Sequence, residues 1–184
     1  MQETDGAIVL DSFIHVLGSF VSLNSIIKTE EKTMVLVNST GEVTDPAFPK
    51  TSPDHIFVHG TLKSGAFASI NYRAVHGKTV SGTGVRWTIT GTEGEIEVMS
   101  PEFAWQYGLP GAHIRIRAGK GDEVEEVDFK DAKEPEYVSS INVPSTNPAR
   151  VYEAFAKGEK GRFASFEDAV ELHRLLDGIK RGSL

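Results

Sequence analysis

The clearest structural signal in this chain is the stretch Val85-Arg86-Trp87-Thr88-Ile89-Thr90-Gly91-Thr92-Glu93-Gly94-Glu95-Ile96-Glu97-Val98. Apolar side chains alternate with polar ones on both sides of a turn flanked by two glycines, which predicts a β-hairpin. One face of this hairpin would be apolar, and the other would place arginine and threonine opposite glutamate. The middle of the chain is therefore predicted to be a mostly antiparallel sheet with one buried face.

Similar strand signals lie on both sides of this hairpin. Two further hairpins are predicted by paired alternating runs at residues 55–62 with 66–73 and at residues 112–118 with 123–129. A β-branched run at residues 33–37 predicts another strand. Residues 45–53 contain three prolines and are predicted to form a loop.

Helical patterns occupy the two ends of the chain. Residues 6–18 are apolar nearly all round, so that either the domain closes over this helix or a partner covers it. Near the other end, Asn147 is predicted to be the N-cap of a helix with Pro148 at its first position, and Ser165 is predicted to cap the last helix. The last helix has an apolar stripe made by Phe166, Val170, Leu172, Leu175, Leu176 and Ile179.

The order of helix, hairpins and helices predicts the fold class α+β: an open, predominantly antiparallel sheet with helices packed on one face. A length of 184 residues suits one domain, and we expect residues 1–184 to form a single domain.

Composition excludes several classes of function. The chain has no cysteine, which rules out disulfides and thiolate chemistry, and its net charge of −7 argues against a nucleic-acid surface. Since it has no apolar run of 18 residues and no basic leader, we expect neither a membrane span nor a signal peptide. The expected location is the cytoplasm, with the nucleus as the alternative.

No metal or cofactor site is predicted for this chain alone. His55 and His59 lie four residues apart on a predicted strand, which separates them by roughly 13 Å and is too far for one ion. Gly82-Thr83-Gly84 precedes a strand, whereas a dinucleotide fingerprint needs a strand, a glycine turn and a helix together.

A few polar residues are candidates for substrate binding. Asp11 lies within an apolar helix, where a carboxylate needs a partner: the alternatives are a structural hydrogen bond, which is favoured, and a pocket residue. Arg73, Arg86 and Trp87 lie at strand positions that could face a cleft or an ordinary sheet surface. No residue of the chain is predicted to be catalytic.

Five phrases in this order carry a family resemblance: Leu10-Asp11 through Phe20, Pro53-Asp54-His55-Ile56 through Leu62, Ser64-Gly65-Ala66 through Arg73, Val85-Arg86-Trp87 through Ile96, and Phe166-Glu167-Asp168 through Leu176. Together they resemble the C-terminal domain of the glucose–fructose oxidoreductase/inositol dehydrogenase family, nearest the branch of the fungal galactose-regulon repressor. The resemblance covers nearly the whole chain.

The resemblance implies an open-sheet domain that covers the substrate and pairs subunits, next to an N-terminal Rossmann domain that holds NAD or NADP and carries the catalytic lysine. It also implies a Gly-His-x-x-Asp pattern in the first helix. With Asp11 as its aspartate, Ala7 and Ile8 take the glycine and histidine positions; the competing register makes His15 the family's histidine. The spacing to the following strand favours the first register, although His15 stays a substrate-binding candidate.

The leading hypothesis is therefore a substrate-cap and oligomerisation domain of a sugar or polyol oxidoreductase-like protein, not catalytic by itself. Its expected partners are a second copy at the sheet face and a Rossmann domain against the first helix. The chain would be a truncation, half of a split protein, or the product of a misassigned start. The alternative is a regulatory protein-binding module like the repressor relatives.

Overall fold

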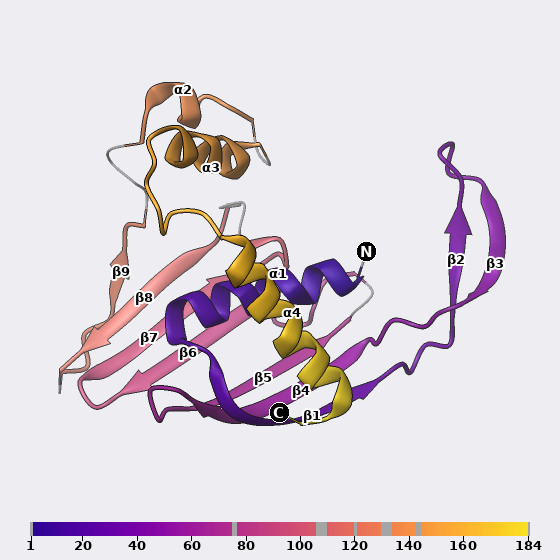
Figure 1. The fold of residues 1–184 in the computed structure, drawn as a ribbon, viewed down its shortest axis with the longest axis horizontal. Coiled ribbons are helices and arrows are strands. Elements are labelled where there is room, and N and C mark those ends of the chain that lie inside the picture. The colour runs from indigo at the N-terminus through magenta and orange to yellow at the C-terminus, as the bar shows by residue number, and fades with distance from the viewer. Residues whose placement is uncertain are drawn as a thin grey trace. The chain divides into compact units, whose positions relative to one another are not determined.

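The structure is a computed structural model that describes residues 2–74, 77–105, 110–119, 121–129, 134–142 and 145–183, with the backbone alone for residues 2–8. The chain divides into two compact units. Unit 1 comprises Met1–Ala74 with Ala164–Leu184, and unit 2 comprises Val75–Phe163. Both units contain antiparallel strands and helices, which confirms the predicted α+β class (Figure 1).

The main sheet of unit 1 has three antiparallel strands in the order β1-β4-β5. They are β1 (Phe20–Lys28), β4 (His55–Leu62) and β5 (Phe67–Arg73), and the last two form the predicted hairpin. Helices α1 (Gln2–Leu17) and α4 (Phe166–Arg181) lie over one side of this sheet (Figure 1). The core of unit 1 is formed by buried apolar side chains of α1, β1, β4 and α4: Leu10, Phe13, Phe20, Leu23, Val58, Leu62, Leu175 and Ile179.

The end of α4 is fixed to the edge of β1. The Ser25 hydroxyl donates to the Ile179 carbonyl at 2.6 Å, and the Ser25 amide donates to the Gly182 carbonyl at 3.0 Å. Gly182 makes this approach possible because it caps the helix with φ at 93°, a conformation that suits glycine. Ser183 then forms an isolated bridge with Asn24, so the last residues of unit 1 extend its sheet.

A separate two-stranded ribbon leaves the sheet between β1 and β4. We call residues 33–49 the arm; it consists of β2 (Thr33–Val37) and β3 (Val43–Pro49), which pair only with each other in the described strand order. The prediction of a loop at residues 45–53 is therefore wrong for its first half. Proline lacks an N–H, but a strand of a two-stranded ribbon has one free side, where Pro46 and Pro49 are tolerated.

Unit 2 contains a four-stranded antiparallel sheet in the order β6-β7-β8-β9. Its strands are β6 (Val85–Gly91), β7 (Gly94–Ser100), β8 (His113–Ala118) and β9 (Glu125–Val127), which confirms two predicted hairpins. Helices α2 (Glu136–Ser139) and α3 (Thr146–Ala156) pack on each other, with Val138 and Ala154 buried.

The helix starts partly differ from the prediction. α3 begins one residue before Asn147, with Ser145 as its N-cap, so Pro148 falls at the third helical position. Proline is acceptable there because the first N–H groups of a helix have no intrahelical acceptor. α4 is capped by Ser165 as predicted, but Phe166 is 90% exposed and does not join the apolar stripe.

We expect Ser165→Ala to lower the free energy of unfolding by about 1 kcal/mol. The Ser165 hydroxyl accepts the Asp168 amide, and the Asp168 carboxylate accepts the Ser165 amide at 2.8 Å, which is a complete capping box. Urea unfolding measures the difference, and Ser145→Ala is the matched control because the Ser145 side chain makes no cap bond. Equal losses in both variants would contradict the role of the box.

Candidate functional site

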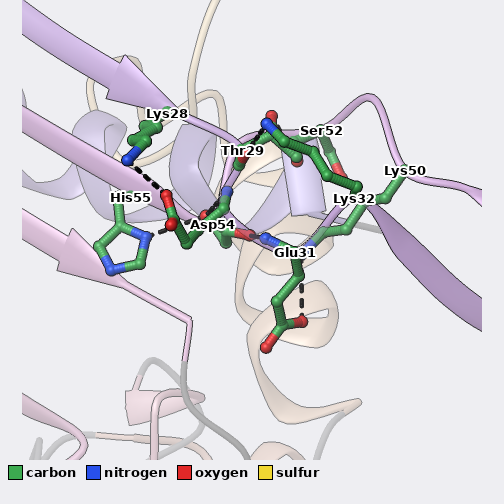
Figure 2. Close-up of polar contacts among 9 residues, drawn as sticks. Lys28, Thr29, Glu31, Lys32, Lys50, Ser52, Asp54 and His55 are labelled. Carbon is green, nitrogen blue, oxygen red and sulfur yellow. Dashed lines mark hydrogen bonds and ion pairs between the residues drawn. The ribbon is translucent and has the colours of Figure 1, made fainter.

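The most connected polar group in unit 1 is the carboxylate of Asp54, which lies just before β4 where the arm joins the sheet (Figure 2). Only 2% of Asp54 is exposed. Its Oδ1 accepts the Glu30 amide at 2.8 Å, and its Oδ2 accepts the Glu31 amide at 2.9 Å. Both donors belong to the segment that leaves β1 for the arm.

Two further side chains reach the same carboxylate from other directions. Lys50, which follows the last strand of the arm, places Nζ 3.3 Å from Oδ2 of Asp54 and has a side chain only 4% exposed. His55 places Nδ1 2.9 Å from Oδ1. Asp54 therefore connects the segment that enters the arm, the segment that leaves it and the first residue of β4. We call this group of residues the arm joint: Glu30, Glu31, Lys50, Asp54 and His55.

These donors lower the pKa of Asp54. The Glu30 amide is the largest cause, followed by the His55 side chain, and burial, the opposing effect, is outweighed. A carboxylate held ionised by so many protein donors is a poor general base, since protonation would break its own hydrogen bonds. The chemistry of the arm joint is consequently that of a structural anchor.

The lowered pKa makes the anchor pH-dependent. Because the folded pKa lies below the ordinary value of 3.8, the carboxylate contributes its full stabilisation above that value and loses it as the pH falls toward the folded pKa. We expect the gap in urea midpoint between wild type and Asp54→Asn to be constant from pH 7 to 5 and to narrow below about pH 3.8. A gap that stayed constant down to pH 2.5 would contradict this assignment.

The side of the unit 1 sheet that faces away from the core forms a second candidate site, which we call the outer face. The strand register places Lys28, His55 and Arg73 in one row across β1, β4 and β5. The adjacent row carries Ile26, 67% exposed, and Phe57, 41% exposed. Phe67 at the start of β5 is 89% exposed. Such a mixed apolar and basic surface is suited to binding another macromolecule.

Unit 2 has a polar sheet face made of charge pairs. Arg86 donates from Nε to Glu97 at 2.7 Å, and Arg115 lies 4.0 Å from the other Glu97 oxygen. The Thr90 hydroxyl donates to Glu95 at 2.9 Å. This confirms the predicted pairing of arginine and threonine with glutamate on one face of the β6–β7 hairpin.

A shallow hollow between α2 and α3, of about 260 Å³, is also lined by charges. Its cations have carboxylate partners: Arg150 pairs with Glu134, Lys157 lies 2.6 Å from Glu153, and Arg162 lies 3.1 Å from Glu159. The hollow therefore offers little uncompensated charge to a ligand.

The five predicted substrate-binding residues lie in different places. Asp11 and His15 are one helical turn apart on α1, the first half-buried and the second exposed. Arg73 ends β5 on the outer face. Arg86 and Trp87 are successive residues of β6 and point to opposite faces, with the Trp87 ring 5.0 Å from that of Trp105. That these five residues bind a substrate stays a prediction. The placement of the Gly-His-x-x-Asp pattern on α1 also stays a prediction, since no side chain is described for Ala7 or Ile8.

The arm joint was missed by the sequence analysis. Its donors at Glu30 and Glu31 are 24 and 23 residues from Asp54, and backbone amides leave no trace in a sequence. The one available signal was the polar pair Asp54-His55 directly before a strand. No cluster of three metal-ligating side chains occurs in the part of the chain that the structure describes. Nor is any helix there long and apolar enough to cross a bilayer.

The comparisons with known proteins identify the class. The family model of the Gal80p C-terminal domain-like proteins matches residues 5–100, just over half of the chain. The chain therefore belongs to the Gal80p C-terminal domain-like family. No curated protein matches the sequence.

Solved structures of that fold cover nearly the whole chain. Gal80p of Saccharomyces cerevisiae, in a super-repressor mutant, matches with a TM-score of 0.74 at 17% identity over 98% of this chain and 48% of its own. The transcriptional regulator Gal80p of Kluyveromyces lactis matches with a TM-score of 0.70 at 21% identity, over 97% of this chain and 43% of its own. A levoglucosan dehydrogenase matches with a TM-score of 0.68 at 18% identity, over 97% of this chain and 49% of its own. The chain thus spans about half the length of these relatives. Its likeness to the dehydrogenase is a likeness of fold.

Proposed function

We propose that this chain is the covering and pairing domain of an oxidoreductase-like protein, whose outer face binds a second copy. The observation that carries the proposal is the outer face itself. α1 and α4 cover the opposite side of the sheet, while Ile26, Phe57 and Phe67 stay exposed. An open sheet with exposed apolar side chains on one face gains stability when that face is buried.

We further propose that NAD or NADP is held by a nucleotide-binding domain and not by this unit. Family membership and the dehydrogenase neighbour support that arrangement. α1 would contact this domain through its exposed residues, which include His15 and Val16, the latter 60% exposed. Asp11, on the same helix, would then lie near the boundary where a sugar or polyol substrate is covered.

Light scattering of the purified chain tests the pairing, and calorimetric titration of the same sample with NAD(H) and NADP(H) tests the cofactor assignment. We expect a dimer mass and no saturable nucleotide binding. A monomer mass at about 100 μM would overturn the pairing role, since homodimer interfaces usually hold at such concentrations. Saturable micromolar binding of either dinucleotide would overturn the cofactor assignment.

The second candidate function is a regulatory protein-binding module, and the family match itself favours it. Both Gal80p neighbours are described as repressor or transcriptional-regulator proteins. Under this alternative the outer face binds a different protein. A stable monomer that keeps its fold in the light-scattering experiment would favour this alternative over self-pairing.

A further inference from the structure

We propose that the arm of one copy packs on the outer face of a second copy, so that two arms are exchanged across a dimer. This inference rests on the proposed pairing function and names the elements that make the contact. It follows from three properties of the described residues: the lack of cover on the arm, the apolar side chains of both surfaces, and their opposite charges.

The arm is apolar on both of its faces. Register and strand alternation place Val35, Val37 and Val43 on one face, each more than half exposed. Met34 and Phe48 are directly paired on the other face and are 44% and 42% exposed. A two-stranded ribbon without a covered face is marginal in water, so the arm gains most from a partner surface.

The outer face offers apolar side chains of matching character. Ile26 and Phe57 are direct neighbours in the register, and Phe67 lies at the far end of β5. The surface is long enough to accept a ribbon, because the arm strands and the sheet strands have similar lengths of five to nine residues.

Charge makes the match specific. The arm contains two acidic residues, Glu42 and Asp45, and no lysine, arginine or histidine. Strands β1, β4 and β5 contain no acidic residue at all. Within their basic row, Lys28 pairs with Glu30 at 2.5 Å and His55 pairs with Asp54, which leaves Arg73 as the cation without an ion pair among the described residues.

A second copy is the partner that this pattern fits. One chain carries both the acidic apolar arm and the basic apolar face, so a two-fold axis creates the same contact twice. The arm joint supports this arrangement, because the ribbon leaves the sheet on a fixed base and not on a free linker.

Charge reversal in separate chains tests the contact. An arm variant, Glu42→Lys with Asp45→Lys, and a face variant, Arg73→Glu, should each weaken the dimer by about 10- to 100-fold through like-charge contacts. An equimolar mixture should recover the wild-type dissociation constant, since every arm in the heterodimer then meets the opposite charge. Circular dichroism of each variant controls for folding.

Disulfide trapping provides a second measurement that does not depend on stability. The chain has no cysteine, so Ser39→Cys at the arm tip and Ser69→Cys on the outer face can be introduced singly. Oxidation of the mixed variants should give a heterodimer that forms more readily than either homodimer. If the wild type is a dimer, but charge reversal does not weaken it and the cysteine variants form no preferred heterodimer, the arm contact is overturned and the pairing function stands. If the wild type is a monomer, both are overturned.

Discussion

Gly60→Ala is expected to destabilise unit 1 by about 3 kcal/mol, measured as the free energy of unfolding in urea. Gly60 lies in β4 opposite Leu23 of β1, next to the irregular register between Phe20 and Ser22. A Cβ at this position would lie 2.1 Å from the Ser22 carbonyl oxygen and 2.9 Å from the Leu23 Cα. Both are backbone atoms, so no side-chain rotation relieves the clash and the two strands must separate.

The matched control is Gly91→Ala, in the hairpin of unit 2. There the nearest atom to a new Cβ is 3.9 Å away, and the residue does not adopt a positive φ. We expect a change within about 0.5 kcal/mol for this control. If both substitutions had the same effect, close strand approach at Gly60 would not be the cause.

Asp54→Asn is expected to lower the melting temperature by about 5–10 °C. An asparagine keeps the shape of the side chain, but its amide group must face either the Glu30 or the Glu31 N–H, each of which now donates to a carboxylate oxygen. Lys50 also loses its buried counterion. The base of the arm is therefore the first region expected to open.

Hydrogen exchange locates this effect. The amides of Glu30 and Glu31 should exchange faster in Asp54→Asn, while the amides of β6 and β7 in unit 2 keep their wild-type protection. Asp122→Asn is the control because this aspartate is exposed in a segment between strands. An unchanged rate at Glu30 and Glu31 would show that the carboxylate does not hold the arm.

Sequence periodicity predicted the hairpins well because each depends on neighbouring residues. The β6–β7 pair needs only alternation and a glycine-flanked turn, and both are local signals. The α4 cap was predictable for the same reason, since Ser165 and Asp168 are three residues apart. Similarly, the five stretches of sequence that carry the family resemblance indicated an open-sheet domain, and the matching family model supports that interpretation.

The rest depended on contacts between distant residues. Prolines at 46 and 49 indicated a loop, and only the pairing of β3 with β2 shows that they lie in a two-stranded ribbon. Likewise, the importance of Asp54 comes from backbone amides on the far side of the arm. The role of Arg73 could not be predicted either, because a side chain on an exposed surface has no periodic signature of its function.

The prolines of β3 have a consequence for how copies of the chain assemble. An apolar ribbon with unpaired edges is a template for open-ended strand addition, which leads to fibres. Two of the seven residues of β3 have no N–H to offer a further strand, so this edge cannot continue a regular hydrogen-bonded ladder. The arm is thereby suited to contact through its faces, and the proposed exchange of arms would end with a closed pair.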